Sequence, residues 1–486
     1  MSEKSIRKNY LYNLTYQILT LITPFLTTPY VSRVLSPYGV GLQSFAFAVS
    51  QNFALFAGMG IGTHGQREVS YAQDDRKERT RIFWELEELS IISTLVWLVI
   101  YITLVMVYIK NHYTLFFVLT LNIVGVATGN VVWLFYGMED FKRIVVRQII
   151  FKILDVIFIF VFIKEESDLA LYVFGSVFFS WLISVTLWLD VRDYVDWPDW
   201  KNLNPFRDIK IIILLFLPTI AVQIYTILDK VMLGFITEGT AESGYYELAL
   251  RISKMPVMIV ATLSSVMMPR IGHLFKKNDV EAIHDYMYRS FRFAWFISIP
   301  LCLGLIAVSD NFVAWFFGDY YGKVAGLLKI SSFILIFIAL NNITGGQYLI
   351  PTGRQNMLTF TLMIGAVSNF TMNLFLIRCY QSYGALVASV IAEALVLLSQ
   401  LYVLRKDFNV FKILFSSINY VIAGAIMFAV LSSFNKNLPA NPLGTFTIIF
   451  SGAAIYFGVL LILRDEFFLT NAERILKGVL KKINRR

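Results

Sequence analysis

The sequence predicts an all-α polytopic membrane protein, and three observations support this fold class. Of the 486 residues, 57% are hydrophobic and only 15% are charged, which is too little polar surface to cover a soluble core of this size. The hydrophobic residues gather in runs of about 20, the length that crosses a bilayer as a helix. These runs are apolar on most faces and do not alternate at period two, so a membrane β-barrel is not expected.

The runs predict about fourteen transmembrane helices. We expect them at residues 10–33, 38–62, 83–109, 114–137, 144–163, 168–189, 210–236, 244–268, 290–309, 324–350, 356–377, 383–404, 411–434 and 443–463. The first run is too long for a cleaved signal, so it is expected to be retained. Lys and Arg gather in every second connection, which predicts that both termini face the cytoplasm in the cell membrane.

The second half of the chain repeats features of the first at an offset of about 200 residues. VGLQSFAFA (40–48) matches SGYYELALR (243–251), and Asp155 aligns with Asn369. Six helices per half is an even number, so both halves have the same orientation. Such parallel repeats are typical of two-lobed transporters, although channels and structural proteins also contain repeats.

These observations predict four regions. We expect an N-lobe with helices 1–6 in residues 1–205, a C-lobe with helices 7–12 in 206–408, extra helices 13 and 14 in 409–465, and an amphipathic cytoplasmic tail in 466–486. In the tail, a capping box from Thr470 to Glu473 predicts a helix start, and its apolar face is expected to lie on the membrane. A separate short surface helix is predicted at 279–289, and residues 194–208 form the linker between the lobes.

Charged residues interrupt the apolar runs. LFLPTIAVQIYTILDKVMLGFI (215–236) carries Asp229 and Lys230 side by side. An ionised group in hydrocarbon is costly and usually functional. The other candidates inside or at the ends of runs are Arg33, Lys152, Asp155, Glu247, Arg251, Lys254 and Glu393.

Two interpretations of these charges remain open. Lys152 with Asp155, and Glu247 with Arg251, have the spacing of helical ion pairs that only stabilise the bundle. Glu247 cannot neutralise both Arg251 and Lys254, however, so this helix face is expected to keep positive charge and to meet water or an anionic ligand.

Several classes of chemistry lack their motifs. The sequence has no phosphate-binding loop of an ATPase, no His-Glu-x-x-His and no Gly-x-Ser-x-Gly. The four histidines have no metal-ligand spacing, and Cys302 and Cys379 are expected to pack rather than react. The net charge of +9 is assigned to loops facing anionic lipid, so no nucleic-acid partner is expected.

An ordered set of motifs carries a resemblance to a known family. The motifs are TPFLTTPYVSRVLSPYGVGLQSFAFAV (23–49), GMGIGTHGQREVS (58–70), FYGMEDFK (135–142), LDKVMLGF (228–235), GYYELALRISK (244–254) and MMPRIG (267–272). Together they resemble the polysaccharide transporter branch, with its Wzx-type flippases, of the multidrug/oligosaccharidyl-lipid/polysaccharide (MOP) exporter superfamily. The resemblance implies a MATE-like fold of two pseudo-symmetric six-helix lobes that works by alternating access. It implies a flippase for polyprenyl-pyrophosphate-linked oligosaccharides, and not an enzyme.

The resemblance and the charges together suggest roles for the candidates. Arg33, Lys152, Arg251 and Lys254 suit an anionic pyrophosphate-sugar headgroup. Asp155, Asp229, Lys230, Glu247 and Glu393 are expected to act as charge partners or to couple H⁺ or Na⁺, with no other cofactor. Membrane lipid and the machinery that polymerises and exports the polysaccharide are the further expected partners.

Three other functions stay open at this point. A MATE-like multidrug cation antiporter needs an acidic cavity, which Arg251 and Lys254 argue against. A lipid II flippase fits fourteen helices, but the basic cluster expected in its first two helices is reduced here to Arg33. A membrane glycosyltransferase or polymerase would release sugar from a donor.

Overall fold

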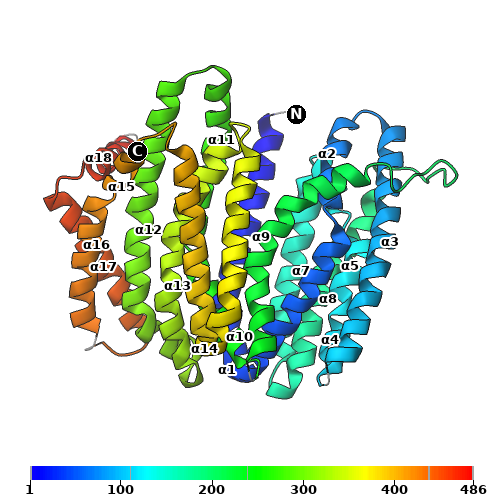
Figure 1. Cartoon of the computed structure of the whole chain (residues 1–486), viewed down its shortest axis with the longest axis horizontal. Coiled ribbons are helices and arrows are strands. Elements are labelled where there is room, and N and C mark those ends of the chain that lie inside the picture. Colours follow the sequence, from blue (N-terminus) through cyan, green and yellow to red (C-terminus); the bar gives the residue numbers. More distant parts are fainter. Residues whose placement is uncertain (1–2, 110, 238, 436–437, 484–486) are drawn as a thin grey trace. The chain divides into compact units, whose positions relative to one another are not determined.

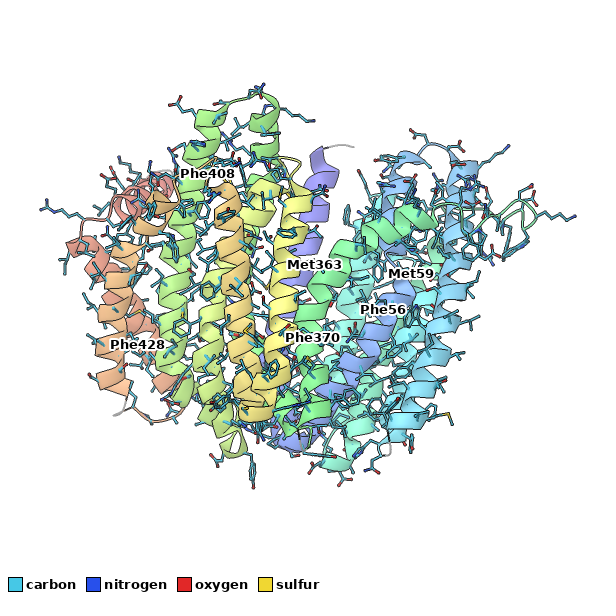
Figure 2. All side chains as sticks on the ribbon, viewed as in Figure 1. Phe56, Met59, Met363, Phe370, Phe408 and Phe428 are labelled. Atoms are coloured by element: carbon cyan, nitrogen blue, oxygen red, sulfur yellow. The ribbon has the colours of Figure 1, made fainter. Side chains whose placement is uncertain are left out.

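The computed structural model describes residues 3–109, 111–237, 239–435 and 438–483. Every regular element in these ranges is a helix (Figure 1). Within the described residues, eight helical segments are long and apolar enough to cross a membrane. Large apolar side chains such as Met363 and Phe370, labelled in Figure 2, are exposed on them, as expected for helices that face lipid. The all-α membrane fold is therefore confirmed, while the count of fourteen helices stays a prediction.

The chain forms two compact units, Met1–Gly244 and Tyr245–Arg486. The first unit contains α1 (Glu3–Gly58), α2 (Ile61–Tyr71), α3 (Arg76–Tyr108), α4 (Tyr113–Val118), α5 (Thr120–Gly129), α6 (Val132–Gly137), α7 (Phe141–Phe162), η1 (Glu166–Asp168), α8 (Leu169–Val191), α9 (Ile209–Ile236) and the start of α10 (Ala241–Lys254). Helices α1, α3, α5, α7 and α8 form its bundle, and α9 lies against α1 and α2.

Helix α1 reverses direction at Ser36, as Figure 1 shows. Pro37 follows Ser36 and disfavours helical backbone at the residue before it, and Ser36 adopts φ 59° and ψ 166°. The runs predicted at 10–33 and 38–62 are therefore the two arms of one bent element. The hydroxyl of Tyr30 donates to the carbonyl of Ile163 at 2.6 Å, which joins the bend to the end of α7.

Beyond the bend, the backbone of α1 touches the start of α10. A Cβ on Gly41 would lie 1.9 Å from the carbonyl oxygen of Thr240, and a Cβ on Gly244 would lie 2.7 Å from the nitrogen of Gly41. Only glycine allows such an approach. Gly41 and Gly244 are also the aligned glycines of the predicted repeat.

The predicted linker lies against α3. The indole of Trp84 stacks on Trp197 with ring centres 6.1 Å apart. The buried guanidinium of Arg79 donates to the carbonyls of Ala72, Gln73 and Tyr194 at 3.1, 2.7 and 2.8 Å. These bonds hold the end of α2 and the start of the linker on one side chain.

An exposed clamp fixes the linker a second time. Arg76 donates to both carboxylate oxygens of Asp196 at 2.9 Å. This hydrogen bond holds the pKa of Asp196 below its ordinary value, as expected for a carboxylate beside a guanidinium.

In the described residues, the second unit contains most of α10 and ten further elements. They are α11 (Val257–Lys276), α12 (Val280–Phe317), η2 (Asp319–Tyr321), α13 (Gly322–Asn341), the π-helix η3 (Asn342–Leu349), α14 (Gln355–Leu404), α15 (Val410–Phe415), α16 (Ile418–Asn435), α17 (Pro442–Ile462) and α18 (Glu466–Ile483). Helix α12 packs along α13, and α13 along α14. On the other side α12 contacts α16 and α17, as can be followed in Figure 1.

Several predicted boundaries are wrong, each for a local reason. The run 244–268 divides into α10 and α11 at Met255 and Pro256, because proline cannot donate the next helical hydrogen bond. The separate surface helix at 279–289 is instead the continuous first part of α12. The runs 356–377 and 383–404, in contrast, correspond to the two helical arms of α14, which meet at a kink at Gln381 with φ 52°.

The tail helix begins earlier than predicted. Asp465 accepts a hydrogen bond from the backbone nitrogen of Phe468 at 2.9 Å and so caps α18 at its true start. The predicted capping box of Thr470 and Glu473 therefore lies inside the helix. The apolar face predicted for this tail depends on side chains that lie outside the described residues.

Asp465 is also a junction between helices of the second unit. Its carboxylate is buried and accepts from Asn419 at 3.1 Å and from the hydroxyl of Tyr420 at 3.3 Å. Arg292 of α12 approaches it at 3.6 Å. One carboxylate thus joins α12, α16 and α18.

Candidate functional site

The charges of the first unit centre on the middle of α7. The ammonium of Lys152 donates to Oδ2 of Asp155 at 3.0 Å, one helical turn away, as the i, i+3 spacing predicts. Asp155 is 5% exposed and its Oδ1 has no hydrogen-bond partner within the described part of the chain, whereas Lys152 is about one-third exposed. The predicted ion pair is therefore present. Its carboxylate is buried with one oxygen that accepts no hydrogen bond, and its ammonium belongs to a partly exposed side chain.

Arg33 lies just before the bend of α1. Its side chain is exposed, while the serine at the bend, Ser36, donates to Oε1 of Glu166 at 2.5 Å. The bend is thus held from the η1 side, and Arg33 extends from a fixed backbone.

Asp229 and Lys230 lie on different faces of α9, because successive helical residues are separated by about 100°. Asp229 is 1% exposed, whereas Lys230 is only partly buried. The carbonyl of Lys230 accepts a hydrogen bond from Ser243 at 3.2 Å, which links α9 to the start of α10.

Helix α10 carries the charges that the sequence singled out in the second unit. Arg251 donates to Oε1 of Glu247 through Nη2 at 2.9 Å and through Nε at 3.2 Å. Lys254 lies in the last turn of the same helix and is half-buried. Both Arg251 contacts fall on one oxygen of Glu247, so the single carboxylate is engaged at Arg251.

Glu393 occupies the second arm of α14. It is 6% exposed, and its Oε2 accepts a hydrogen bond from the amide of Asn341 at 2.8 Å. Asn341 is the last residue of α13, directly before the π-helix η3. A π-helical segment frequently marks a functional site.

A layer of uncharged polar groups was missed by the sequence analysis. The hydroxyls of Tyr246 and Ser389 lie 3.1 Å apart, and Asn369 approaches Ser389 at 3.4 Å. All three side chains are buried. Asn369 was noticed only as the counterpart of Asp155. The sequence signal for this layer is the occurrence of amide and hydroxyl residues inside apolar runs, which the charge pattern does not reveal.

The nine predicted residues therefore form three groupings within their own units. Lys152 bonds Asp155 on α7, Arg251 bonds Glu247 on α10, and Glu393 bonds an amide instead of a cation in the contact given above. The other four predicted residues lie elsewhere: Arg33 on α1, Asp229 and Lys230 on α9, and Lys254 on α10.

Comparison with known proteins identifies the family. A family model described as "Polysaccharide biosynthesis protein" matches residues 6–275, and a model described as "Lipid II flippase MurJ" matches residues 153–450. Each match covers more than half of the chain.

Two curated relatives match over nearly their whole length. A "Putative O-antigen transporter" of Escherichia coli (strain K12) is 23% identical over 83% of this chain and 97% of its own. "Capsular polysaccharide biosynthesis protein CapF" of Staphylococcus aureus is 22% identical over 82% of this chain and 100% of its own.

Solved structures share the fold. "Lipid II flippase MurJ, inward closed conformation" matches with a TM-score of 0.73 and 16% identity, covering 94% of this chain and 99% of that one. An inward-facing MATE family transporter of the MOP superfamily matches with a TM-score of 0.60 and 15% identity, covering 85% and 96%. The chain shares its fold with these proteins. It belongs to the polysaccharide biosynthesis protein family, and with its transporter and flippase relatives it is a transporter rather than an enzyme.

Proposed function

We propose that this protein is a flippase that moves polyprenyl-pyrophosphate-linked oligosaccharide repeat units from the inner to the outer leaflet of the cytoplasmic membrane. The product would supply a surface polysaccharide such as capsule, exopolysaccharide or O-antigen. The observation that carries the proposal is α10, whose last turn places two cations, Arg251 and Lys254, inside an apolar run of the chain. The relatives named for O-antigen and capsular polysaccharide support the substrate class.

The proposed substrate explains why cations stand inside this membrane protein. A pyrophosphate-linked sugar has an anionic headgroup and a long apolar tail. The tail can remain in lipid, whereas the headgroup needs a solvated path with positive charge. The guanidinium of Arg251 presents a planar fork that matches phosphate oxygens as well as the carboxylate of Glu247. Arg251 would therefore exchange Glu247 for the headgroup, and Lys254 would add a point charge one turn away.

Arg33 and Lys152 are proposed to serve the same headgroup from the first unit. Lys152 already bonds one carboxylate oxygen of Asp155 and keeps about one-third of its side chain exposed, so an anion can approach it without unfolding the helix. The break at Pro256 divides one apolar run into two shorter helical arms, α10 and α11. Such arms suit the rocking or bending that alternating access requires.

We further propose that transport is coupled to H⁺ or Na⁺. Asp155, Asp229, Glu247 and Glu393 are the candidate carriers, with Lys230 as a charge partner. Asp155 is the strongest, because a buried carboxylate with one oxygen free of hydrogen bonds is an unfavourable resting state that a bound cation would relieve.

We propose that both termini lie in the cytoplasm, because most Lys and Arg fall in the connections on that side. The machinery that polymerises and exports the polysaccharide would then meet the protein on the outer side, where the flipped units emerge.

A lipid II-type substrate is the second candidate. The observation favouring it is the MurJ family model over residues 153–450. Both candidates are lipid-linked sugars, so the distinction concerns the sugar and not the mechanism.

The test is to delete the gene and identify the lipid-linked glycan that accumulates. Under the proposal, one oligosaccharide repeat unit builds up on the inner leaflet and surface polysaccharide is lost. Accumulation of the cell-wall precursor would favour the second candidate. If no lipid-linked glycan accumulates and surface polysaccharide is normal, both are wrong.

A further inference from the structure

The first unit has an open polar pocket that none of the charged residues discussed above lines. Its volume is about 310 Å³, and its walls come from α1, α5, α8 and α9 together with the residue after α5. Its polar lining includes the side chains of Gln51, Asn122, Asn130, Ser180 and Ser184 and the indole of Trp181. The described lining residues include no charged side chain.

Two hydrogen bonds hold the walls in place. The amide of Asn122 donates to the hydroxyl of Ser50 at 2.8 Å, which joins α5 to α1. The indole N–H of Trp181 donates to the hydroxyl of Thr128 at 2.9 Å, which joins α8 to α5. The glycine at position 125 leaves room beside the indole, since a Cβ there would come within 3.3 Å of Trp181 Cδ1. The cavity is therefore built by specific contacts.

Four polar side chains of the cavity have capacity left for a ligand. In the described part of the chain, Gln51, Asn130, Ser180 and Ser184 make no hydrogen bond through their side chains. Asn130 and Ser180 are exposed, and Gln51 and Ser184 are partly exposed, so all four side chains are accessible to a ligand that enters the pocket. Their convergence on one cavity therefore points to a guest that can both donate and accept hydrogen bonds.

The chemistry of the walls selects a neutral sugar. Amide and hydroxyl side chains each offer donors and acceptors, which match the hydroxyl groups of a pyranose. The indole of Trp181 supplies an aromatic surface for the apolar face of the ring. A pyrophosphate would find no cation here, and an organic cation would find no carboxylate.

We propose that this cavity is a subsite for an uncharged sugar unit of the lipid-linked substrate. The inference rests on the proposed flippase function and adds to it a separate place where the glycan is read. The charged residues would hold the pyrophosphate, whereas Gln51 and Asn130 would distinguish a sugar-bearing lipid from a bare one.

The experiment measures binding of two probes to purified protein in nanodiscs. The first probe is the lipid-linked oligosaccharide that accumulates in the gene-deletion strain. The second is polyprenyl pyrophosphate of the same chain length without sugar. The variants are Gln51→Leu and Asn130→Leu. The control is Asn52→Leu, because Asn52 adjoins Gln51 but donates to the carbonyl of Ala48 in its own helix at 2.8 Å.

Each cavity variant is expected to bind the sugar-bearing probe about five- to tenfold more weakly, the effect of one or two lost hydrogen bonds. Its affinity for the bare probe, and both affinities of Asn52→Leu, should equal those of the wild type. If a leucine variant does not fold, Ser184→Ala removes one hydroxyl without adding bulk and takes its place.

The outcomes separate the two proposals. Unchanged affinity for both probes, or an equal loss for both, overturns the sugar subsite while leaving the flippase function standing. A wild-type protein that binds neither probe overturns the proposed function, and the subsite with it.

Discussion

At the scale of single residues, the proposed function depends most on two cations of α10, Arg251 and Lys254. Arg251 bonds one oxygen of Glu247, and Lys254 follows three residues later near the helix end. Their value to the protein should lie in transport and not in folding, because helix pairs of this kind contribute little stability.

The first prediction concerns these two cations. Arg251→Ala and Lys254→Ala should each abolish glycan export while the protein still reaches the membrane. Arg251→Lys should retain part of the activity, because it keeps the charge and loses the fork. Export is measured by surface polysaccharide in the deletion strain. Arg289→Ala is the control, since Arg289 forms an exposed pair with Asp285 at 2.9 Å. Normal export in the alanine variants would remove both residues from the site.

The second prediction concerns the pair on α7. Lys152→Met removes the partner of a buried carboxylate, so we expect a loss of about 1–3 kcal/mol in the free energy of unfolding. The double variant Lys152→Met with Asp155→Leu should recover most of this loss, because no buried charge remains. Thermal unfolding in detergent measures both. If the double variant is no more stable than Lys152→Met, the loss in the single variant does not come from an unpaired buried carboxylate at Asp155.

Residue spacing predicted the two helical pairs but not the bond between Asn341 and Glu393. The pairs on α7 and α10 are separated by three or four residues and depend only on helix geometry. Asn341 and Glu393 lie 52 residues apart, so their meeting depends on how α13 packs against α14. Asn341 is also uncharged, so the pattern of charges inside the apolar runs did not single it out.

At the scale of elements, the apolar runs located the helices, but their joints depended on backbone chemistry. Pro37 and Pro256 explain the bend in α1 and the break after α10, and both were visible in the sequence. The helix at 279–289 was predicted to be separate because its amphipathic pattern stops where the apolar run begins. The helix itself continues through that point as α12.

The third prediction tests the bend of α14. A Cβ on Gly384 would lie 2.1 Å from the carbonyl oxygen of Leu376, so Gly384→Ala must move backbone. We expect a loss of about 1–3 kcal/mol in stability. Gly304→Ala on α12 is the matched control, because nothing lies within 4 Å of its added methyl, and it should be neutral or slightly stabilising. Equal thermal midpoints for the two variants would contradict the close turn.

The fourth prediction concerns the linker. Arg79→Met leaves the carbonyls of Ala72, Gln73 and Tyr194 without their donor, so we expect a loss of about 2–4 kcal/mol. Limited proteolysis should then cut residues 194–208 faster. Arg76→Met should have a much smaller effect, because its pair with Asp196 is exposed. Similar proteolysis of the two variants would show that the buried guanidinium does not anchor the linker.

At the scale of the whole molecule, the family motifs and the composition were sufficient to predict a transporter fold. The two helical arms of α1 and of α14 each match one apolar run. The identity of the sugar was not within reach of the sequence, because sugar specificity depends on amides and hydroxyls whose effect is visible only when helices come together.

The fifth prediction concerns energy coupling. If Asp155 or another buried carboxylate carries an ion, collapse of the H⁺ or Na⁺ gradient should stop export in energised membrane vesicles. Asp155→Asn should then transport at a rate that no longer depends on the gradient. Undiminished export by the wild type in de-energised vesicles would mean that the protein is a facilitator.

The junction at Asp465 has a practical consequence for anyone who shortens this protein. Residues 465–483 resemble a dispensable appendage, yet a stop codon placed before Asp465 would remove the carboxylate that Asn419, Tyr420 and Arg292 share. Removal of the tail would therefore act as a core mutation. An expression tag should follow Ile483 and never replace what precedes it.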